Sequence, residues 1–189
     1  MAATPSTMIP LGSMAPDFLL PDPATEASVS FADIRGERGT LIMFICNHCP
    51  YVKLIADEIG RTGAEYQSRG IGIAAISSND AENYPEDAPF LMVEEKERRS
   101  YTFPYLYDES QDVALAYEAA CTPDFFLFDA SDRLVYRGQF DDARPNNGRP
   151  VTGNDLRAAM DILLKGEKIP ENQTPSIGCN IKWKNFQLW

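Results

Sequence analysis

LIMFICNHCPYV, residues 41–52, is the stretch that decides the fold of this chain. Its first five residues are all apolar, which is typical of a strand buried on both faces of a sheet. Two cysteines, Cys46 and Cys49, and the only histidine of the chain, His48, follow directly. Apolar residues then recur at helical spacing until Gly70, which predicts a helix. The stretch is therefore a strand that enters a helix through a cysteine-containing turn.

A second apolar run, Ile71 to Ile76, predicts another buried strand. Strand, helix and strand together imply two parallel neighbours joined by a right-handed crossover. Farther along the chain, Phe125–Phe128 and Leu134–Tyr136 predict a β-hairpin. This order of elements predicts an α/β fold with a central mixed β-sheet flanked by helices.

Shorter elements surround this unit. Residues 17–20 and 28–31 predict two short strands, which would form an N-terminal β-hairpin extension. Ser110 predicts the N-cap of a helix, because its hydroxyl can accept a backbone hydrogen bond. A last helix is predicted to begin at Thr152 or Asn154. We expect a flexible N-terminus at residues 1–10, a domain at 11–169, and a C-terminal tail at 170–189 packed on the domain.

Composition narrows the class of protein. A chain of 189 residues with 44% hydrophobic and 24% charged residues suits one soluble globular domain. The net charge of -11 argues against nucleic acid or an anionic membrane as partner, because both repel an acidic surface. No segment approaches the roughly 20 apolar residues that cross a bilayer. The first residues lack the features of a signal peptide. We therefore expect a cytoplasmic location, where paired cysteines are more often catalytic or metal-binding than structural.

The two cysteines have the spacing of a redox couple. Cys46 is predicted to lie where the strand ends and the helix begins, and a helix N-terminus stabilises an anion. There the pKa of a thiol can fall from about 8.5 to roughly 3.5–7.5. Protonated His48 would add a second stabilising charge, and Cys49, at i+3, shares a face with Cys46. We therefore predict Cys46 as the nucleophile and Cys49 as the resolving thiol.

A zinc site and a coincidence are the competing interpretations. Zinc would need four ligands, which Cys46, Cys49, Cys121 and Cys179 could supply. Structural zinc sites usually add a second pair of closely spaced ligands, and the other two cysteines stand alone. Coincidental buried cysteines are rarer at a strand–helix junction. The redox interpretation is favoured, and we expect no metal and no cofactor.

Thr122-Pro123 is a second candidate feature. Pro123 stands at the head of the predicted strand at residues 125–128, where proline removes a hydrogen-bond donor from the ladder. A cis peptide bond would explain its presence, since the free-energy cost of the cis form is small only before proline. An ordinary trans proline at a strand start fits the local sequence equally well.

These motifs together resemble the thioredoxin superfamily, and within it the peroxiredoxin-like (AhpC/TSA-related) branch of thiol-disulfide oxidoreductases. Residues 12–18, GSMAPDF, are similar to the opening of that branch. Residues 125–129, FFLFD, are similar to its later strand, and residues 175–183, PSIGCNIKW, to its C-terminal tail. The resemblance spans about residues 10 to 184. It implies a thioredoxin-like fold in which a cis-proline loop, Thr122 and Pro123, faces the cysteine pair.

The resemblance also implies a function. We expect a thiol-disulfide oxidoreductase in redox homeostasis, with a thiol or disulfide of a protein as substrate and an electron donor of the thioredoxin or glutathione type. His48 would tune the potential. A peroxiredoxin-like thiol peroxidase, an antioxidant enzyme, is the first alternative. It is weaker because this chain has Ile42 and Cys46 at the positions where peroxiredoxins have proline and threonine. The position of the peroxiredoxin arginine falls near Pro123. A non-enzymatic metal-binding or partner-docking module is the second alternative.

Cys121 and Cys179 complete the set of cysteines. As isolated small apolar residues they could simply be half-buried. However, Cys121 adjoins Thr122, and Cys179 lies in a tail whose aromatic residues (Trp183, Phe186, Trp189) could fold over the domain. We therefore hypothesise that Cys121 and Cys179 form a second redox pair or a relay to Cys46 and Cys49. Oligomeric state has no signal in the sequence.

Overall fold

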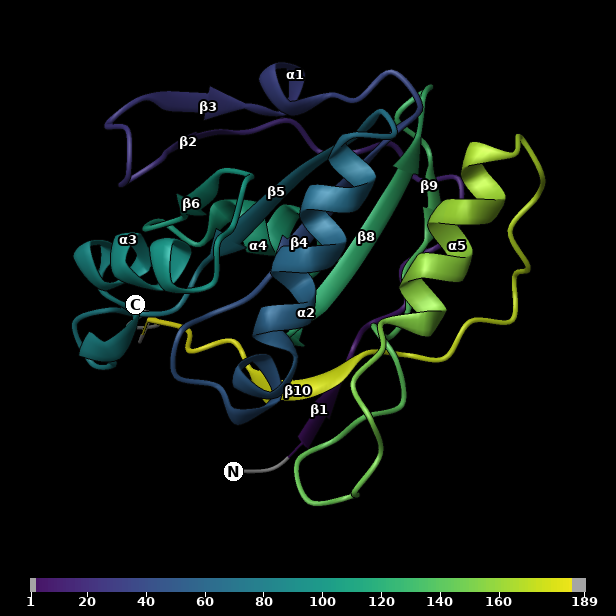
Figure 1. The fold of residues 1–189 in the computed structure, drawn as a ribbon. Coiled ribbons are helices and arrows are strands. Elements are labelled where there is room, and N and C mark those ends of the chain that lie inside the picture. The colour runs from purple at the N-terminus through teal and green to yellow at the C-terminus, as the bar shows by residue number, and fades with distance from the viewer. Residues whose placement is uncertain (1–2, 185–189) are drawn as a thin grey trace, which may run out of the picture.

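A computed structural model describes residues 3–184 of the chain (Figure 1). Its strands are β1 (Ala3–Pro5), β2 (Leu19–Pro21), β3 (Ser28–Ser30), β4 (Gly39–Phe44), β5 (Ile71–Ser77), β6 (Tyr105–Tyr107), β7 (Cys121–Thr122), β8 (Asp124–Asp129), β9 (Leu134–Tyr136) and β10 (Ile177–Asn180). Its helices are α1 (Phe31–Ile34), α2 (Pro50–Gln67), the 3-10 helix η1 (Pro85–Asp87), α3 (Pro89–Arg98), α4 (Asp112–Ala116) and α5 (Asn154–Leu164).

A five-stranded mixed sheet forms the centre, with the strand order β6-β5-β4-β8-β9. Strands β4, β5 and β6 are parallel, whereas β8 and β9 are antiparallel to their neighbours. Leu41 on β4 pairs with Ile73 on one side and Leu127 on the other. The predicted mixed sheet, the strand–helix–strand unit and the hairpin of β8 and β9 are therefore confirmed.

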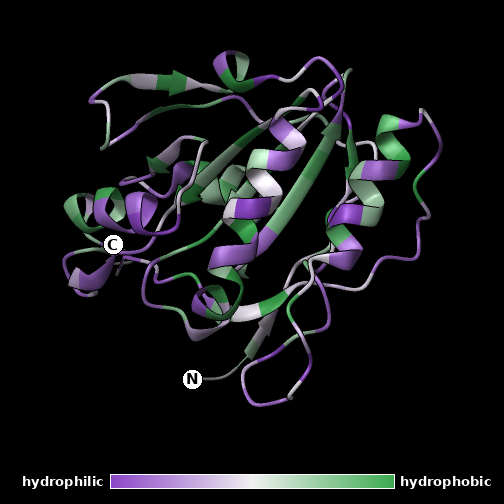
Figure 2. Cartoon of the chain, in the orientation of Figure 1, coloured by the Kyte–Doolittle hydropathy of each residue, from purple (hydrophilic) through white to green (hydrophobic). Residues whose placement is uncertain are grey.

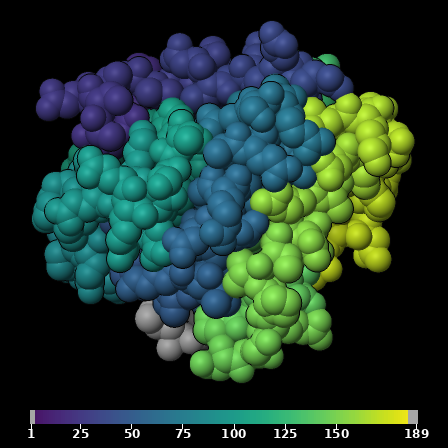
Figure 3. Space-filling view, viewed as in Figure 1, coloured from purple at the N-terminus to yellow at the C-terminus, as the bar shows by residue number. Residues whose placement is uncertain are grey.

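Each face of this sheet carries its own core. Leu41 and Met43 pack into a cluster with residues of α2 and α5, whereas Ile42 and Phe44 pack with residues of α1 and α4 on the other face. Alternate side chains of a strand point to opposite faces, so a strand between two cores must be apolar throughout. In Figure 2 the central strands are mostly green, and purple residues recur along α2 and α5. Figure 3 shows α2 at the surface between α3 and α5.

Two smaller sheets flank the domain. Strands β2 and β3 pair antiparallel and confirm the predicted N-terminal hairpin. The third sheet has the order β1-β10-β7, so the C-terminal tail lies between the N-terminal strand and the strand that precedes Pro123. Within the segment predicted to be a flexible N-terminus, residues 3–5 form β1, whose backbone groups pair with β10. Of the tail aromatics, Trp183 is exposed, and Phe186 and Trp189 lie outside the described residues.

Helix starts differ from the sequence predictions. Helix α2 begins at Pro50, and its N-cap is Cys49 rather than Cys46. Pro50 explains the difference, because proline suits the first helical position and holds the preceding residue in an extended conformation. Gln111 rather than Ser110 holds the N-cap position of α4, although the Ser110 hydroxyl accepts a hydrogen bond from the backbone N–H of Asp112. Helix α5 begins at Asn154, one of the two predicted starts. Within residues 3–184, none of the helices is both long and apolar enough to span a bilayer.

Candidate active site

Cys46 and Cys49 lie between the end of β4 and the start of α2. Both are buried, with exposed fractions of 1% and 0%. Cys49 occupies the N-cap of α2, where the free N–H groups of the first turn favour a negative charge. Cys46 lies three residues earlier and outside the helix, so the helix terminus acts more directly on Cys49.

The loop of Thr122 and Pro123 contacts both cysteines. The peptide bond between these two residues is cis. The Sγ atom of Cys46 lies 3.4 Å from the hydroxyl Oγ1 of Thr122. The Cys49 thiol can donate to the carbonyl oxygen of Thr122, at a distance of 3.1 Å. One residue of the proline loop thus bridges the pair, which agrees with the arrangement that the resemblance implies.

The acidity of the two thiols is the reverse of the prediction. Hydrogen bonding from Cys46, together with contacts from Cys179 and backbone N–H groups, lowers the pKa of Cys49 to about 5. Burial raises the pKa of Cys46 well above its ordinary value, and hydrogen bonding to Cys49 and the negative charge of Asp87 add to the rise. Because α2 begins after Cys49, the thiolate is favoured at Cys49 and not at Cys46.

His48 is held by Asp87, a residue that sequence reasoning missed. Its ring Nδ1 lies 2.6 Å from Oδ2 of Asp87, which also accepts a hydrogen bond from the side chain of Asn79 at 2.7 Å. The hydrogen bond between His48 and Asp87 raises the pKa of His48. Burial opposes ionisation of Asp87, but the bonds from His48 and Asn79 outweigh it and lower its pKa. No motif marks Asp87, because it belongs to a short 3-10 helix far from the cysteines in sequence.

Cys121 and Cys179 are both buried but lie in different surroundings. In the antiparallel pairing of β10 with β7, Cys179 is opposite Thr122, and Cys121 is opposite Asn180. Neighbouring residues of a strand face opposite sides, so Cys121 and Cys179 do not face each other, contrary to the hypothesis of a direct pair. Instead, the Sγ atom of Cys179 lies 2.9 Å from that of Cys49. Burial raises the pKa of Cys179 to about 12 and also raises that of Cys121.

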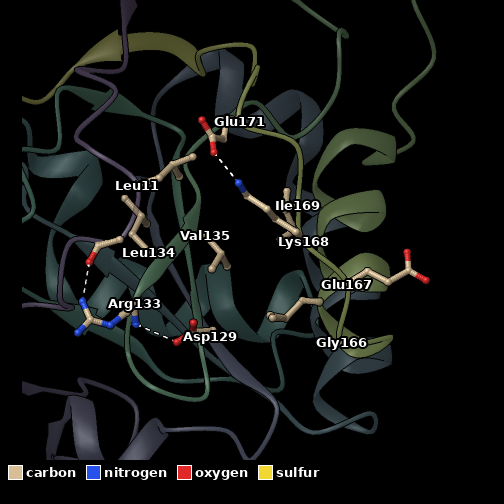
Figure 4. A pocket seen from close by; sticks show the side chains of 12 residues that line it. Leu11, Asp129, Arg133, Leu134, Val135, Gly166, Glu167, Lys168, Ile169 and Glu171 are labelled. Atoms are coloured by element: carbon tan, nitrogen blue, oxygen red, sulfur yellow. Dashed lines mark hydrogen bonds and ion pairs between the residues drawn. The ribbon is translucent and has the colours of Figure 1, made fainter.

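Two other features bear on ligand binding. The Sγ of Cys46, a ring nitrogen of His48 and a carboxylate oxygen of Asp87 lie within 4.8 Å of one another, whereas the four cysteines form no such cluster among residues 3–184. A cavity of about 570 Å³ lies between the β9 region and the segment after α5 (Figure 4). Leu134, Val135 and Ile169 line it, with Arg133 and Lys168 at its edge. None of the predicted site residues lines this cavity.

Comparisons with known proteins bear on the family and the fold. Residues 11–137 match the AhpC/TSA family. The thiol-disulfide oxidoreductase ResA of Geobacillus thermodenitrificans is 29% identical over 132 residues, which cover 69% of this chain and 70% of that protein. An uncharacterized conserved protein from Geobacillus kaustophilus has a crystal structure that is similar with a TM-score of 0.96 and 54% identity, over 98% of both chains.

A more distant structure confirms the fold. The putative thiol:disulfide interchange protein DsbE from Chlorobium tepidum is 19% identical, with a TM-score of 0.63 over 82% of this chain and 98% of that chain. At this identity the likeness concerns the fold alone. The predicted thioredoxin-like fold is thereby confirmed.

Proposed function

This chain belongs to the AhpC/TSA family, and on that premise we propose that it exchanges thiols and disulfides through a reversible disulfide between Cys46 and Cys49. One relative of the chain is named a thiol-disulfide oxidoreductase, which supports oxidoreductase activity at the level of the family. The finer proposal rests on one observation. Two cysteines at CxxC spacing both contact Thr122, and one of them has a pKa of about 5.

We assign the attack to Cys49 and the resolution to Cys46. The Cys49 thiolate attacks one sulfur of a substrate disulfide, forms a mixed disulfide and releases the first substrate thiolate. Cys46 then loses its proton and attacks Sγ of Cys49. A Cys46–Cys49 disulfide forms, and the second substrate sulfur leaves as a thiolate that takes up a proton. The substrate has gained two electrons from the cysteine pair. A dithiol donor then reduces the Cys46–Cys49 disulfide and returns the pair to its thiol form.

Insulin reduction by dithiothreitol tests this function. Replacing Cys49 by serine should reduce the rate to that of dithiothreitol alone, and replacing Cys46 by serine should lower the rate, whereas Ser68→Ala, at the far end of α2, should leave the rate unchanged. The roles separate on mass spectrometry: when Cys46 and Cys179, the two thiols beside Cys49, are both replaced by serine, a mixed disulfide with the substrate should accumulate through Cys49, and Cys49→Ser should not form one. Full activity in both cysteine variants would exclude the proposed function, and trapping through Cys46 would reverse the roles.

Thiol peroxidase activity is the second candidate. It is favoured by the Cys49-Pro50 sequence and the low pKa of Cys49. It is opposed by the sulfur contacts, because within residues 3–184 the side-chain hydrogen-bond partners of the two sulfurs are each other, Thr122 and Cys179, and no arginine is among them. Hydrogen peroxide should therefore oxidise Cys49 no faster than other thiols of similar acidity, which a competition assay measures.

Metal binding is a third candidate, supported by the cluster of Cys46, His48 and Asp87. All three side chains are of types that bind zinc. Against this, Asp87 already accepts hydrogen bonds from His48, Asn79 and the backbone of Asn47. Elemental analysis of protein purified without chelator should find substoichiometric metal. The protein substrate, the electron donor of thioredoxin or glutathione type and the cytoplasmic location stay predictions.

A further inference from the structure

We propose that Cys179 is a second resolving thiol, which forms a disulfide with Cys49 in place of Cys46. This proposal rests on the proposed function and adds a third redox-active cysteine to it. Cys179 comes from the C-terminal tail, whereas Cys46 and Cys49 come from the central β4–α2 junction. The cysteine with the low pKa therefore has two thiol neighbours rather than one.

Distance is the first argument. The Sγ atoms of Cys49 and Cys179 lie 2.9 Å apart, and a disulfide bond is about 2.05 Å long. The two sulfurs therefore need to approach by only about 0.9 Å to bond. Both residues are buried, so their contact is made inside the protein and not at its surface.

The backbone holds Cys179 in this position from two sides. Its strand β10 pairs with β7 through the opposed residues Cys179 and Thr122, and with β1 through Cys179 and Ala3. The preceding residue must be glycine: a Cβ at Gly178 would lie 1.9 Å from the carbonyl oxygen of Thr122. This close approach brings β10 against the loop that contacts Cys46 and Cys49. Cys179 is thus positioned by the same residue, Thr122, that bridges the pair.

The reaction needs no oxidant or reductant beyond the substrate disulfide and the thiols of the proposed function. When Cys49 holds a substrate in a mixed disulfide, the Cys179 thiol loses its proton and attacks Sγ of Cys49. The Cys49–Cys179 bond forms, and the substrate sulfur leaves as a thiolate that takes up the proton. The same attack on a Cys46–Cys49 disulfide would release Cys46 as a thiol, with no net change in oxidation state. Burial, together with hydrogen bonding to Cys49 and its negative charge, raises the pKa of Cys179; a mixed disulfide at Cys49 removes that charge, which favours loss of the Cys179 proton at this step.

Disulfide mapping tests the proposal. Cys46→Ser, Cys179→Ser and the double variant are treated with oxidised glutathione, and peptides are identified by mass spectrometry without reduction. Cys46→Ser should form Cys49–Cys179, and Cys179→Ser should form only Cys46–Cys49. The double variant should retain glutathione on Cys49, with release at least about tenfold slower than in Cys46→Ser. Oxidised wild-type protein is mapped in parallel, so that the test does not depend on a variant that fails to fold. The wild-type sample should contain both the Cys46–Cys49 and the Cys49–Cys179 bond.

The outcomes separate this proposal from the proposed function. If Cys179→Ser forms Cys46–Cys49 but neither Cys46→Ser nor wild-type protein forms Cys49–Cys179, the second resolving thiol is excluded and the function stands. If no bond between Cys49 and either partner forms in any of the proteins, both fail. A bond from Cys49 to Cys121 in Cys46→Ser would also overturn the proposal, because the register places Cys121 on the other face of β7.

Discussion

The ring Nδ1 of His48 lies 2.6 Å from Oδ2 of Asp87, which is fully buried. The other carboxylate oxygen of Asp87 accepts hydrogen bonds from the backbone N–H groups of Asn47, at 2.8 Å, and His48, at 3.2 Å. One carboxylate therefore holds both the backbone and the imidazole of the segment between the two cysteines.

Replacing Asp87 by alanine should destabilise the protein by about 3 kcal/mol, because it leaves a half-buried histidine and several buried donors without their partner. Unfolding in urea measures the loss. The matched control is Glu86→Ala, since Glu86 is exposed and neighbours Asp87 in the same short helix. An equal effect of both substitutions would contradict the anchoring role of Asp87.

The interaction of His48 with Asp87 should make stability depend on pH. The pKa of His48 is raised above its unfolded value of about 6.5. Its contribution is therefore fully present below about pH 6.5 and is lost as the pH rises through the folded-state pKa. Asp87→Asn should lower the pKa of His48, as followed by NMR of the ring protons, and should remove this dependence. A His48 pKa that is the same in both proteins would contradict the prediction.

Thiolate formation in the reduced protein should have its midpoint near the pKa of Cys49, about 5, as followed by ultraviolet absorbance. Cys49→Ala should abolish this low-pH step. Cys46→Ala should move it to higher pH, because the hydrogen bond from Cys46 is the main cause of the lowered pKa. Cys179→Ala should move it in the same direction by less. A low-pH step that disappears in Cys46→Ala and persists in Cys49→Ala would restore the assignment predicted from the sequence.

Gly178→Ala should separate β10 from β7, since the added Cβ would meet the carbonyl oxygen of Thr122 at 1.9 Å. Alkylation of Cys46 and Cys49 should then become faster, and less Cys49–Cys179 disulfide should form on oxidation. Gly148→Asn is the control, because Gly148 has open space around it and asparagine tolerates its positive φ. Unchanged alkylation in Gly178→Ala would show that β10 does not limit access to the pair.

Much of the fold could be predicted from local patterns. The apolar run of β4 required a strand covered on both faces, and the two cores confirm this. The spacing of Cys46 and Cys49 and the proline at residue 123 indicated the site, and a likeness in several motifs indicated the thioredoxin-like fold. These features can be predicted from the sequence because burial, periodicity and proline geometry each depend on residues that are close in sequence.

The tertiary structure decided which groups surround each sulfur. Asp87 meets His48 across 39 positions of the chain, and Cys179 meets Cys49 across 130. The thiol that favours the anion also changed from the predicted Cys46 to Cys49. The physical reason is that a buried thiol's pKa depends on its hydrogen-bond donors, nearby charges and distance from a helix terminus. Those neighbours come from β10, η1 and β7, whose positions follow only from the packing of the whole chain.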